Sequence, residues 1–373
     1  MSQYRYRYGD TFGKAIGFED VLKKRELKSV DIVRRLGVIT NERVFINDFP
    51  IKNPATIFNS AIVVIGNEAV LYARIILGYY MYISSVVELK VPLQDIYSGT
   101  ININSYSAKI VLYPSTRYDI WGVEDPRVYS IDEYILATYT RRTISYFNPS
   151  IRIERTLPIT AVYEKKNRWE YYWRKIHIYR FPQDLRVHVV SDKDAFLVKT
   201  NGELYLFHRP HMDDEGWYLI ISRVPSDILS KVFEERENEI KEVTIFNPIE
   251  VMRPANFEIK LGWATPPIEL KPGKLVALIH GVDAEINAYR MFAIELELSR
   301  DEIVITAVTP TYIMEPKMPY EIFGDRPYTV FPCGLWKLDN KYLISYGAGD
   351  FAIGIGEIDL NELLGYLDKG RMY

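Results

Sequence analysis

The hydrophobic positions of this chain recur in turn-then-strand units that are typical of β-hairpins. Each unit has a short turn of Gly, Asn, Asp or Pro followed by a strand rich in Leu, Ile, Val and Tyr. Five turns have this form: Gly66–Glu68, Asp132–Glu133, Asn201–Glu203, Pro272–Lys274 and Asp339–Lys341. Their last residues are separated by 65, 70, 71 and 67 positions. Near-constant spacing predicts an all-β fold with five equivalent units, a five-bladed β-propeller; a β-sandwich with fortuitous spacing is the alternative.

The segments before these turns read as the strands that enter each hairpin. They are Phe58–Ile65, Glu124–Ile131, Asp192–Lys199, Thr265–Leu270 and Phe331–Leu338. In a propeller the first strand of every blade lines the central channel, so we expect residues at the start of these strands to converge on one pocket.

The two ends of the chain depart from the hairpin pattern. Apolar positions between Phe18 and Leu36 fit an amphipathic helix, and a second short helix is expected over Leu360–Leu367. We therefore expect an N-terminal helical extension over residues 1–40 and a propeller over residues 41–373, which ends in a short C-terminal helix. The N-terminal helix would seal the propeller, dock on another subunit or lie solvated on the surface.

Composition narrows the classes of partner. The 373 residues are 48% hydrophobic, with 46 Lys plus Arg against 49 Asp plus Glu, so the net charge of -3 provides no basic field for nucleic acid or an anionic membrane. The first residues lack the apolar core of a secretion signal, and no segment reaches the roughly 20 apolar residues needed to span a bilayer. These features indicate a cytoplasmic protein.

Cysteine and histidine usage argues against a metal centre. The five histidines have no spacing typical of zinc ligands, and Cys333 has no second cysteine to pair with. A buried core position suits Cys333 better than a role as a nucleophile. We therefore expect neither a metal nor an organic cofactor.

Polar residues gather where the hairpin strands begin or end. The segment Gly122-Val-Glu-Asp-Pro-Arg127 places two adjacent carboxylates, Glu124 and Asp125, beside Arg127. One carboxylate can pair with the arginine while the other stays available for proton transfer, although a structural salt bridge is the alternative. Four further clusters contain Asn59, Ser60 and Arg74; Lys193, Asp194 and Arg209; Lys260 and His280; and Asp350.

Taken together, these segments resemble glycoside hydrolase family 130, the β-mannoside phosphorylases and related β-mannosidases, which are five-bladed propellers. The resemblance covers Phe58 to Asp350. Its motifs are Phe58-Asn-Ser-Ala, Gly122-Val-Glu-Asp-Pro-Arg127, Lys193-Asp-Ala, His208-Arg-Pro210, Pro266-Pro-Ile, His280-Gly281 and Tyr346-Gly-Ala-Gly-Asp350.

The resemblance implies roles for individual residues. Asp125 would be the general acid that protonates the leaving oxygen of a β-mannoside, through a hydroxyl of the sugar. The substrate-binding group would be Asn59, Ser60, Arg74, Glu124, Arg127 and Asp350. The phosphate-binding group would be Lys193, Arg209, Lys260, His280 and Tyr289, with a lysine at 193 where the bidentate fork of an arginine is equally expected.

The chain also departs from the family pattern. Val198-Lys199 replace a usual Phe-Pro, and Trp263 stands where a small residue is usual. These differences leave the acceptor preference undefined.

The cations favour phosphorolysis over hydrolysis. An inverting hydrolase needs a second carboxylate, roughly 6.5–9.5 Å from the acid, to activate water; a phosphorylase needs cations that hold phosphate. We expect a β-mannoside oligosaccharide and inorganic phosphate to yield α-mannose 1-phosphate with inversion. The alternatives are an inverting β-mannosidase acting on β-1,2-mannosides, with Asp194, Asp283 or Glu285 as base, and a non-catalytic sugar-binding propeller. A homo-oligomer is compatible with the sequence, which defines no subunit number.

Overall fold

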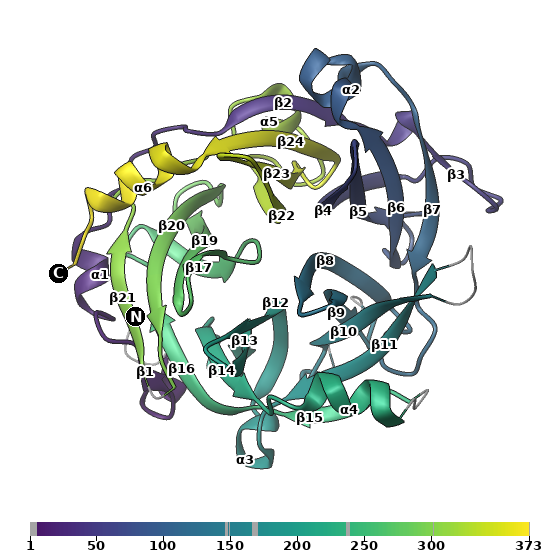
Figure 1. The fold of residues 1–373 in the computed structure, drawn as a ribbon. Coiled ribbons are helices and arrows are strands. Elements are labelled where there is room, and N and C mark those ends of the chain that lie inside the picture. Colours follow the sequence, from purple (N-terminus) through teal and green to yellow (C-terminus); the bar gives the residue numbers. More distant parts are fainter. Residues whose placement is uncertain are drawn as a thin grey trace.

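Five β-sheets are arranged around a central axis in the computed structural model, which describes residues 6–145, 148, 150–165, 171–235, 239–300 and 302–372 (Figure 1). Each sheet is one blade, with its first strand nearest the axis. The five-bladed propeller predicted from the hairpin spacing is therefore confirmed.

All five predicted turns connect the first two strands of a hairpin. From the axis outward, the first blade contains β4 (Thr56–Ile65), β5 (Glu68–Ile76), β6 (Ser84–Pro92) and β7 (Tyr106–Leu112), and the second contains β8 (Gly122–Ile131), β9 (Tyr134–Arg142), β10 (Thr156–Lys165) and β11 (Tyr171–Arg180). In the same direction, the third contains β12 (Val189–Thr200), β13 (Glu203–Met212), β14 (Leu219–Val224) and β16 (Phe246–Met252); the fourth contains β17 (Glu258–Trp263) with β18 (Ile268–Lys271), β19 (Lys274–Asp283), β20 (Tyr289–Leu298) and β21 (Ile303–Val308); and the fifth contains β22 (Val330–Leu338), β23 (Lys341–Ala348) and β24 (Ala352–Asp359).

Segments from outside the hairpins add a fourth or fifth strand to four blades. Near the N-terminus, β1 (Gly13–Lys14) pairs with β16, β2 (Arg34–Ile39) with β24 and β3 (Val44–Ile46) with β7. In the second blade, β15 (Lys241–Thr244) pairs with β11. The last blade thus combines one strand from the start of the chain with three from its end, which closes the ring.

The predicted N-terminal helix over Phe18–Leu36 is largely wrong. Helix α1 spans only Asp20–Lys23, and the end of the expected helix lies in the strand β2. The edge of β24 offers unpaired backbone groups, and the register Arg34↔Glu357 to Ile39↔Ile353 satisfies them. A division at residue 40 would therefore separate β2 from the blade that it completes.

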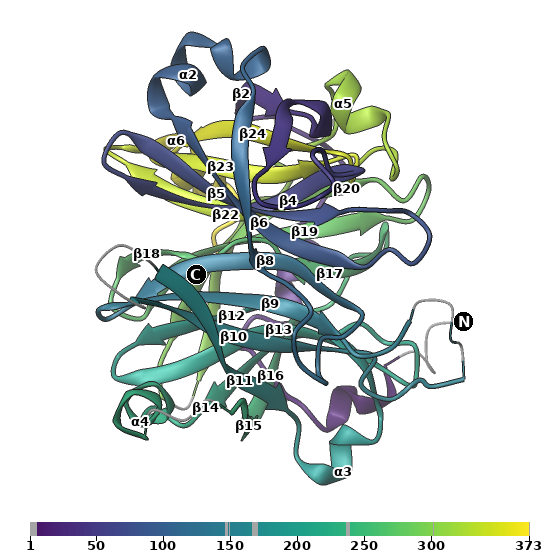
Figure 2. The same ribbon diagram turned by 90° about the vertical axis from the view of Figure 1, so that its right-hand side faces the viewer.

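The short helices lie at the periphery of the molecule (Figure 2). They are η1 (Arg7–Asp10), η2 (Asn41–Arg43), η3 (Thr100–Asn102), α2 (Leu93–Ser98), α3 (Gln183–Arg186), α4 (Ile228–Glu235), α5 (Pro319–Ile322) and α6 (Leu360–Asp368). The predicted C-terminal helix is confirmed by α6, where Asp359 caps the first turn by accepting from the backbone N–H of Asn361 at 2.8 Å. Among the described residues no helix has both the length and the apolar character needed to cross a bilayer.

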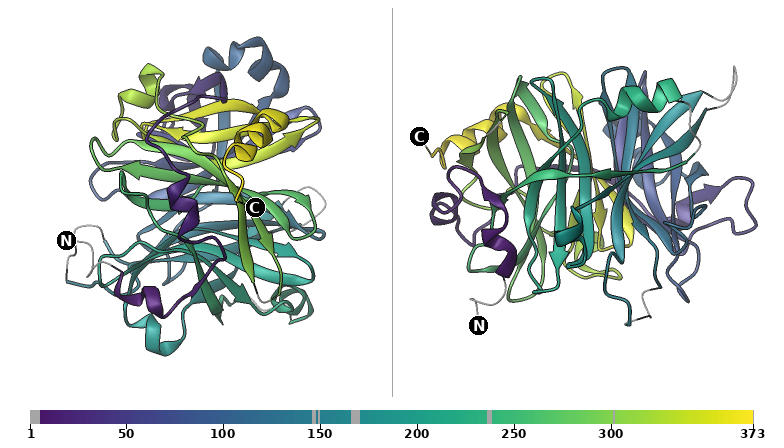
Figure 3. Two further views of the ribbon diagram at one scale, coloured as in Figure 1. Left: turned by 90° about the vertical axis from the view of Figure 1, so that its left-hand side faces the viewer. Right: turned by 90° about the horizontal axis from the view of Figure 1, so that it is seen from below.

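The N-terminal segment crosses the outside of the fourth blade, next to the C-terminal end (Figure 3). Arg25 anchors it there: its guanidinium lies 3.0 Å from Glu258 Oε1, and both side chains are fully buried. The guanidinium also packs 3.6 Å from the ring centroid of Phe292, and Tyr312 donates a 2.6 Å hydrogen bond to Glu258. A buried charge pair of this kind is costly to break because the remaining partner loses its counter-charge.

We predict that Arg25→Ala lowers the free energy of unfolding by about 3–5 kcal/mol, since it leaves the buried carboxylate of Glu258 uncompensated. Guanidinium denaturation followed by tryptophan fluorescence measures the change. Lys23→Ala, which removes an exposed pair with Asp20, is the matched control and should leave the midpoint unchanged. Equal midpoints for the two variants would show that Arg25 is no anchor.

Candidate active site

Each inner strand contains a shift of register at the end that approaches the axis. The shifts fall between Phe58 and Ser60, Glu124 and Arg127, Lys193 and Phe196, Glu258 and Lys260, and Pro332 and Gly334. Such β-bulges leave residues unpaired and re-aim their side chains. The same backbone device is therefore used in all five blades where they meet.

Three bulge residues adopt left-handed backbone conformations. Asn59, Asp125 and Asp194 have φ values of 46°, 51° and 54°. Asn and Asp tolerate this region better than other non-glycine residues, and such strain is concentrated at functional sites. Residue choice at these positions thus suits the backbone as well as the chemistry.

A cavity of about 650 Å³ opens where the bulges converge. Eight of the twelve predicted site residues line it: Asn59, Arg74, Asp125, Lys193, Arg209, Lys260, Tyr289 and Asp350. The cavity has the size of a typical ligand site. Its lining brings the carboxylates of Asp125 and Asp350 together with three cations, Arg209, Lys260 and Arg326, which we call the cation group.

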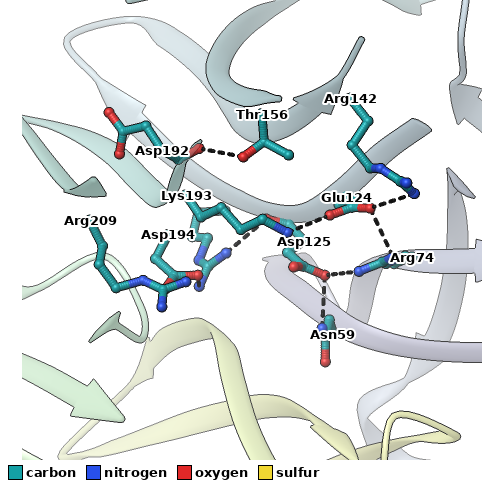
Figure 4. Close-up of polar contacts among 11 residues, drawn as sticks. Asn59, Arg74, Glu124, Asp125, Arg142, Thr156, Asp192, Lys193, Asp194 and Arg209 are labelled. Carbon is teal, nitrogen blue, oxygen red and sulfur yellow. Dashed lines mark hydrogen bonds and ion pairs between the residues drawn. The ribbon is translucent and has the colours of Figure 1, made fainter. Parts of the chain in front are cut away.

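Asp125 is held by two donors in the close-up of Figure 4. Its Oδ1 accepts from Asn59 Nδ2 at 2.8 Å and from Arg74 Nη1 at 3.0 Å. Both hydrogen bonds use the same oxygen, so the carboxyl group has a fixed orientation while Oδ2 can accept a contact from a ligand.

Glu124 lies behind the cavity wall, not on it. Its side chain is fully buried and accepts from Arg74 Nη2 at 3.1 Å, Lys193 Nζ at 2.9 Å and Arg142 Nη1 at 3.5 Å. The predicted direct contact with substrate does not fit this placement. Glu124 instead orients Arg74 and Lys193, which donate to its carboxylate and themselves line the cavity.

Arg127 is also absent from the described cavity lining, since its guanidinium is enclosed by protein. It donates to the carbonyls of Asp125, Trp263 and Ala264 at 2.9, 3.1 and 3.0 Å and to Asp194 Oδ1 at 3.3 Å. Its role is to hold the second, third and fourth blades together instead of contacting a ligand.

Ser60 and His280 likewise lie outside the described lining. The Ser60 hydroxyl donates to the Ala61 carbonyl at 2.8 Å. His280 is fully buried 4.6 Å from the ring centroid of Phe331, and burial lowers its pKa to about 3. A neutral imidazole behind the wall supports the site without adding positive charge to it.

Asp194 is an ionised partner of the cations. Its Oδ2 lies 2.8 Å from Arg209 Nε and 3.4 Å from His280 Nε2, and its Oδ1 lies 3.3 Å from Arg127. Burial alone would raise the pKa of Asp194, but the charges of Arg209 and Arg127 hold it well below its ordinary value. Such a carboxylate is a weak base.

Lys260, Arg209 and Arg326 surround two aromatic rings. Lys260 Nζ is 5.0 Å from the ring centroid of Trp217 and 5.3 Å from that of Tyr289, and Arg326 Cζ is 4.3 Å from the Tyr289 ring. Burial, and then the charges of Arg209 and Arg326, lower the pKa of Lys260 to about 7. This concentration of poorly solvated positive charge can bind an anion.

Asp350 has a pKa raised to about 6. Burial is the main cause; Arg74 opposes it, and the charge of Asp125 adds to it. At neutral pH Asp350 is ionised, and its carboxylate can accept hydrogen bonds from sugar hydroxyls.

Several lining residues escaped the sequence analysis as site candidates. Phe58 and Phe331 lie within segments that it singled out, whereas Ile76, Tyr82, Trp217, Asp325, Arg326 and Thr329 do not. Asp194, expected only as a candidate base for hydrolysis, also lines the cavity. Asp325 and Arg326 belong to a loop before β22, where only Gly324 and Pro327 signal a turn. No local pattern shows that such a loop returns to the axis.

The departures from the family pattern lie away from the described cavity lining. Trp263 is fully buried and donates to the His208 and Ile220 carbonyls, both at 3.1 Å. Val198 and Lys199 lie at the far end of β12, where Lys199 pairs with Asp132. Neither change shapes the cavity directly.

The remaining candidates also have clear placements. Cys333 is buried, as expected for a core residue, and burial raises its pKa. Asp283 accepts from Arg290 and from backbone N–H groups, and Glu285 is exposed; neither belongs to the described lining.

Comparison with known proteins identifies relatives along most of the chain. The profile of the β-1,4-mannooligosaccharide phosphorylase family, glycoside hydrolase family 130, matches residues 23–369. A β-1,2-mannobiose phosphorylase from Thermoanaerobacter sp. (strain X514) is 28% identical over 315 residues, which cover 82% of this chain and 91% of the relative. A 1,2-β-oligomannan phosphorylase from the same organism is 27% identical, covering 68% and 74%.

Solved structures share the architecture. The β-1,2-mannobiose phosphorylase from Listeria innocua, in complex with β-1,2-mannobiose, superposes with a TM-score of 0.66 at 18% identity, covering 90% of this chain and 99% of that one. At this identity the likeness establishes the fold alone.

We predict that sulfate binds the cation group more weakly as pH rises through 7, because Lys260 is protonated below its pKa of about 7 and neutral above it. A hydrogen bond from a charged donor contributes roughly 1.5–3 kcal/mol, so affinity should fall about tenfold or more between pH 6.5 and 8.5. Calorimetric titration with sodium sulfate, which stays dianionic throughout, measures the change.

Lys260→Gln should bind sulfate weakly at both pH values and abolish this dependence. Asp350→Asn is the control for the other nearby titrating group and should retain the loss of affinity above pH 7. An unchanged pH profile in Lys260→Gln would contradict the assignment.

Proposed function

Since this chain belongs to glycoside hydrolase family 130, we propose that it is an inverting phosphorylase that converts a β-mannoside and inorganic phosphate into α-mannose 1-phosphate and a free acceptor. The observation that carries the proposal is the content of one cavity: Asp125 with its two donors, together with Arg209, Lys260 and Arg326. The phosphorylase names of the curated relatives support the same reaction.

The proposed reaction is a single displacement at the anomeric carbon. A phosphate oxygen forms the new bond to that carbon while the bond to the acceptor oxygen breaks, and the leaving oxygen receives the proton that Asp125 supplies. Asn59 and Arg74 fix the Asp125 carboxyl group, and with Asp350 they offer hydrogen-bonding partners for the mannose ring. Protonation is needed because an unactivated alkoxide is a poor leaving group.

The cation group serves the nucleophile. Phosphate needs no general base, but its charges must be offset and its oxygen held opposite the leaving group. Arg209 and Lys260 supply that charge from the third and fourth blades and Arg326 from the loop before the fifth, and Tyr289 adds a hydroxyl at the same wall. Lys193 lines the cavity between this group and Glu124.

A hydrolytic reaction has less support from the geometry. Of the three candidate bases, only Asp194 lines the described cavity, and its ion pairs make it a weak proton acceptor. Asp350, with a pKa of about 6, is the carboxylate best suited to activate water if hydrolysis occurs.

We expect cleavage of β-1,2-mannobiose to require phosphate and to yield α-mannose 1-phosphate, detected by ³¹P NMR. Asp125→Asn should reduce kcat/KM by about 10²–10⁴-fold, the usual contribution of a positioned acid. The loss should be much smaller with a nitrophenyl β-mannoside, whose leaving group needs little protonation.

The matched control is Asp132→Asn, which changes an aspartate of a hairpin turn and should retain full activity. Free mannose released at the same rate without phosphate would refute phosphorolysis in favour of hydrolysis. Near-normal turnover of the mannobiose by Asp125→Asn would refute the assignment of the acid.

We also expect Arg326→Gln to raise the KM for phosphate about tenfold, since a charge-assisted hydrogen bond is lost, while the KM for the mannoside changes less than about twofold. Initial rates over a matrix of both substrates separate the two constants. Lys317→Gln, which removes an exposed cation that pairs with Asp31, is the control. A rise in the mannoside KM alone would place Arg326 on the sugar side.

A further inference from the structure

A second, basic cavity adjoins the first. It has a volume of about 260 Å³ and is lined by Arg142, Arg152, Arg155 and Lys193, with the hydroxyl residues Thr156 and Ser191. Among the described residues, no aspartate or glutamate lines this side cavity. Beside Ile144, Val190 and His211, its wall therefore contains cations and hydroxyl groups, which are donors for an anionic ligand.

The carboxylates that pair with these cations lie outside the side cavity. Glu124, fully buried, accepts from Arg74, Arg142 and Lys193 at once, so it cannot by itself balance their charge. Arg152 pairs with Glu215, whose side chain is 59% exposed to solvent, and such a pair contributes little. An anion in the side cavity would compete with Glu215 for Arg152.

The side cavity begins beside the proposed proton donor. Lys193 lines both cavities, and Glu124, which Lys193 and Arg142 both contact, directly precedes Asp125. In Figure 4, Glu124 and Arg142 lie on the side of Asp125 away from Asn59. Arg209, in the cation group proposed for phosphate, instead lies against Asp194.

We propose that the side cavity binds an anionic substituent, a phosphate or a carboxylate, carried by the acceptor sugar. The inference rests on the proposed phosphorolysis, because the sugar that leaves from Asp125 must extend out of the mannose site next to that residue. With less volume than the roughly 300 Å³ of a typical site for a whole ligand, the side cavity suits a single substituent or sugar unit. Arginines can bind a phosphate or a carboxylate through two parallel hydrogen bonds.

The test runs the reaction in the synthetic direction from α-mannose 1-phosphate. Mannose, mannose 6-phosphate and mannuronic acid serve as acceptors of matched size, and the better anionic acceptor identifies the substituent. We expect kcat/KM for at least one anionic acceptor to exceed that for mannose about tenfold. In Arg152→Gln/Arg155→Gln this ratio should fall to about one.

Arg300→Gln is the matched control, since Arg300 is an exposed arginine that also pairs with a glutamate, on the loop between β20 and β21. It should leave the acceptor ratio unchanged. Equal use of neutral and anionic acceptors by the wild type, or a preference that survives the double variant, would overturn the inference.

Calorimetric binding of the preferred anionic acceptor provides a readout that needs no turnover. The double variant should weaken this binding about tenfold while sulfate affinity at the cation group changes little. Binding that depends on Arg152 and Arg155 without synthesis from any acceptor would refute the proposed function and retain the anion site. Synthesis with mannose, but no such binding, would refute the anion site alone.

Discussion

The arrangement of the cavity depends on the buried guanidinium of Arg127. From the second blade it donates to the carbonyl of Asp125, to the carboxylate of Asp194 in the third blade and to the carbonyls of Trp263 and Ala264 in the fourth. It also lies 5.4 Å from the ring centroid of Phe331 in the fifth. One planar group with five donors thus fixes two left-handed bulges relative to each other, a task that a lysine could not perform.

Opposite charges that line one cavity give it its chemistry. Asp125 and Asp350 line it together with Arg209, Lys260 and Arg326. Burial is the main cause of the lowered pKa of Lys260, and the charges of Arg209 and Arg326 add to it. Burial is also the main cause of the raised pKa of Asp350, and the charge of Asp125 adds to it. A ligand of complementary charge would relieve the like-charge part of each shift.

Much of the fold and part of the site could be predicted from the sequence, because turn chemistry and strand composition are local. The five hairpins and helix α6 follow from such patterns. The prediction of an N-terminal helix was wrong because β2 pairs with the open edge of β24, which no local signal in residues 18–36 reveals. Ser60 and Glu124 do not line the cavity, although each directly adjoins a lining residue, because the bulges at Asn59 and Asp125 re-aim side chains in a way that the sequence does not reveal. Trp217 and Arg326 reach the cavity from segments whose path depends on tertiary packing.

Closure of the ring by β2 has a consequence for biosynthesis. Arg34 pairs with Glu357, so β2 finds its partner only after the four blades that lie between them in the sequence have been translated. Contacts between residues so distant in sequence are slow to form because the entropy of closing the intervening loop is lost first. The last blade is therefore assembled after the other four have been translated, and until then the nascent propeller exposes the unpaired edges on which aggregation begins.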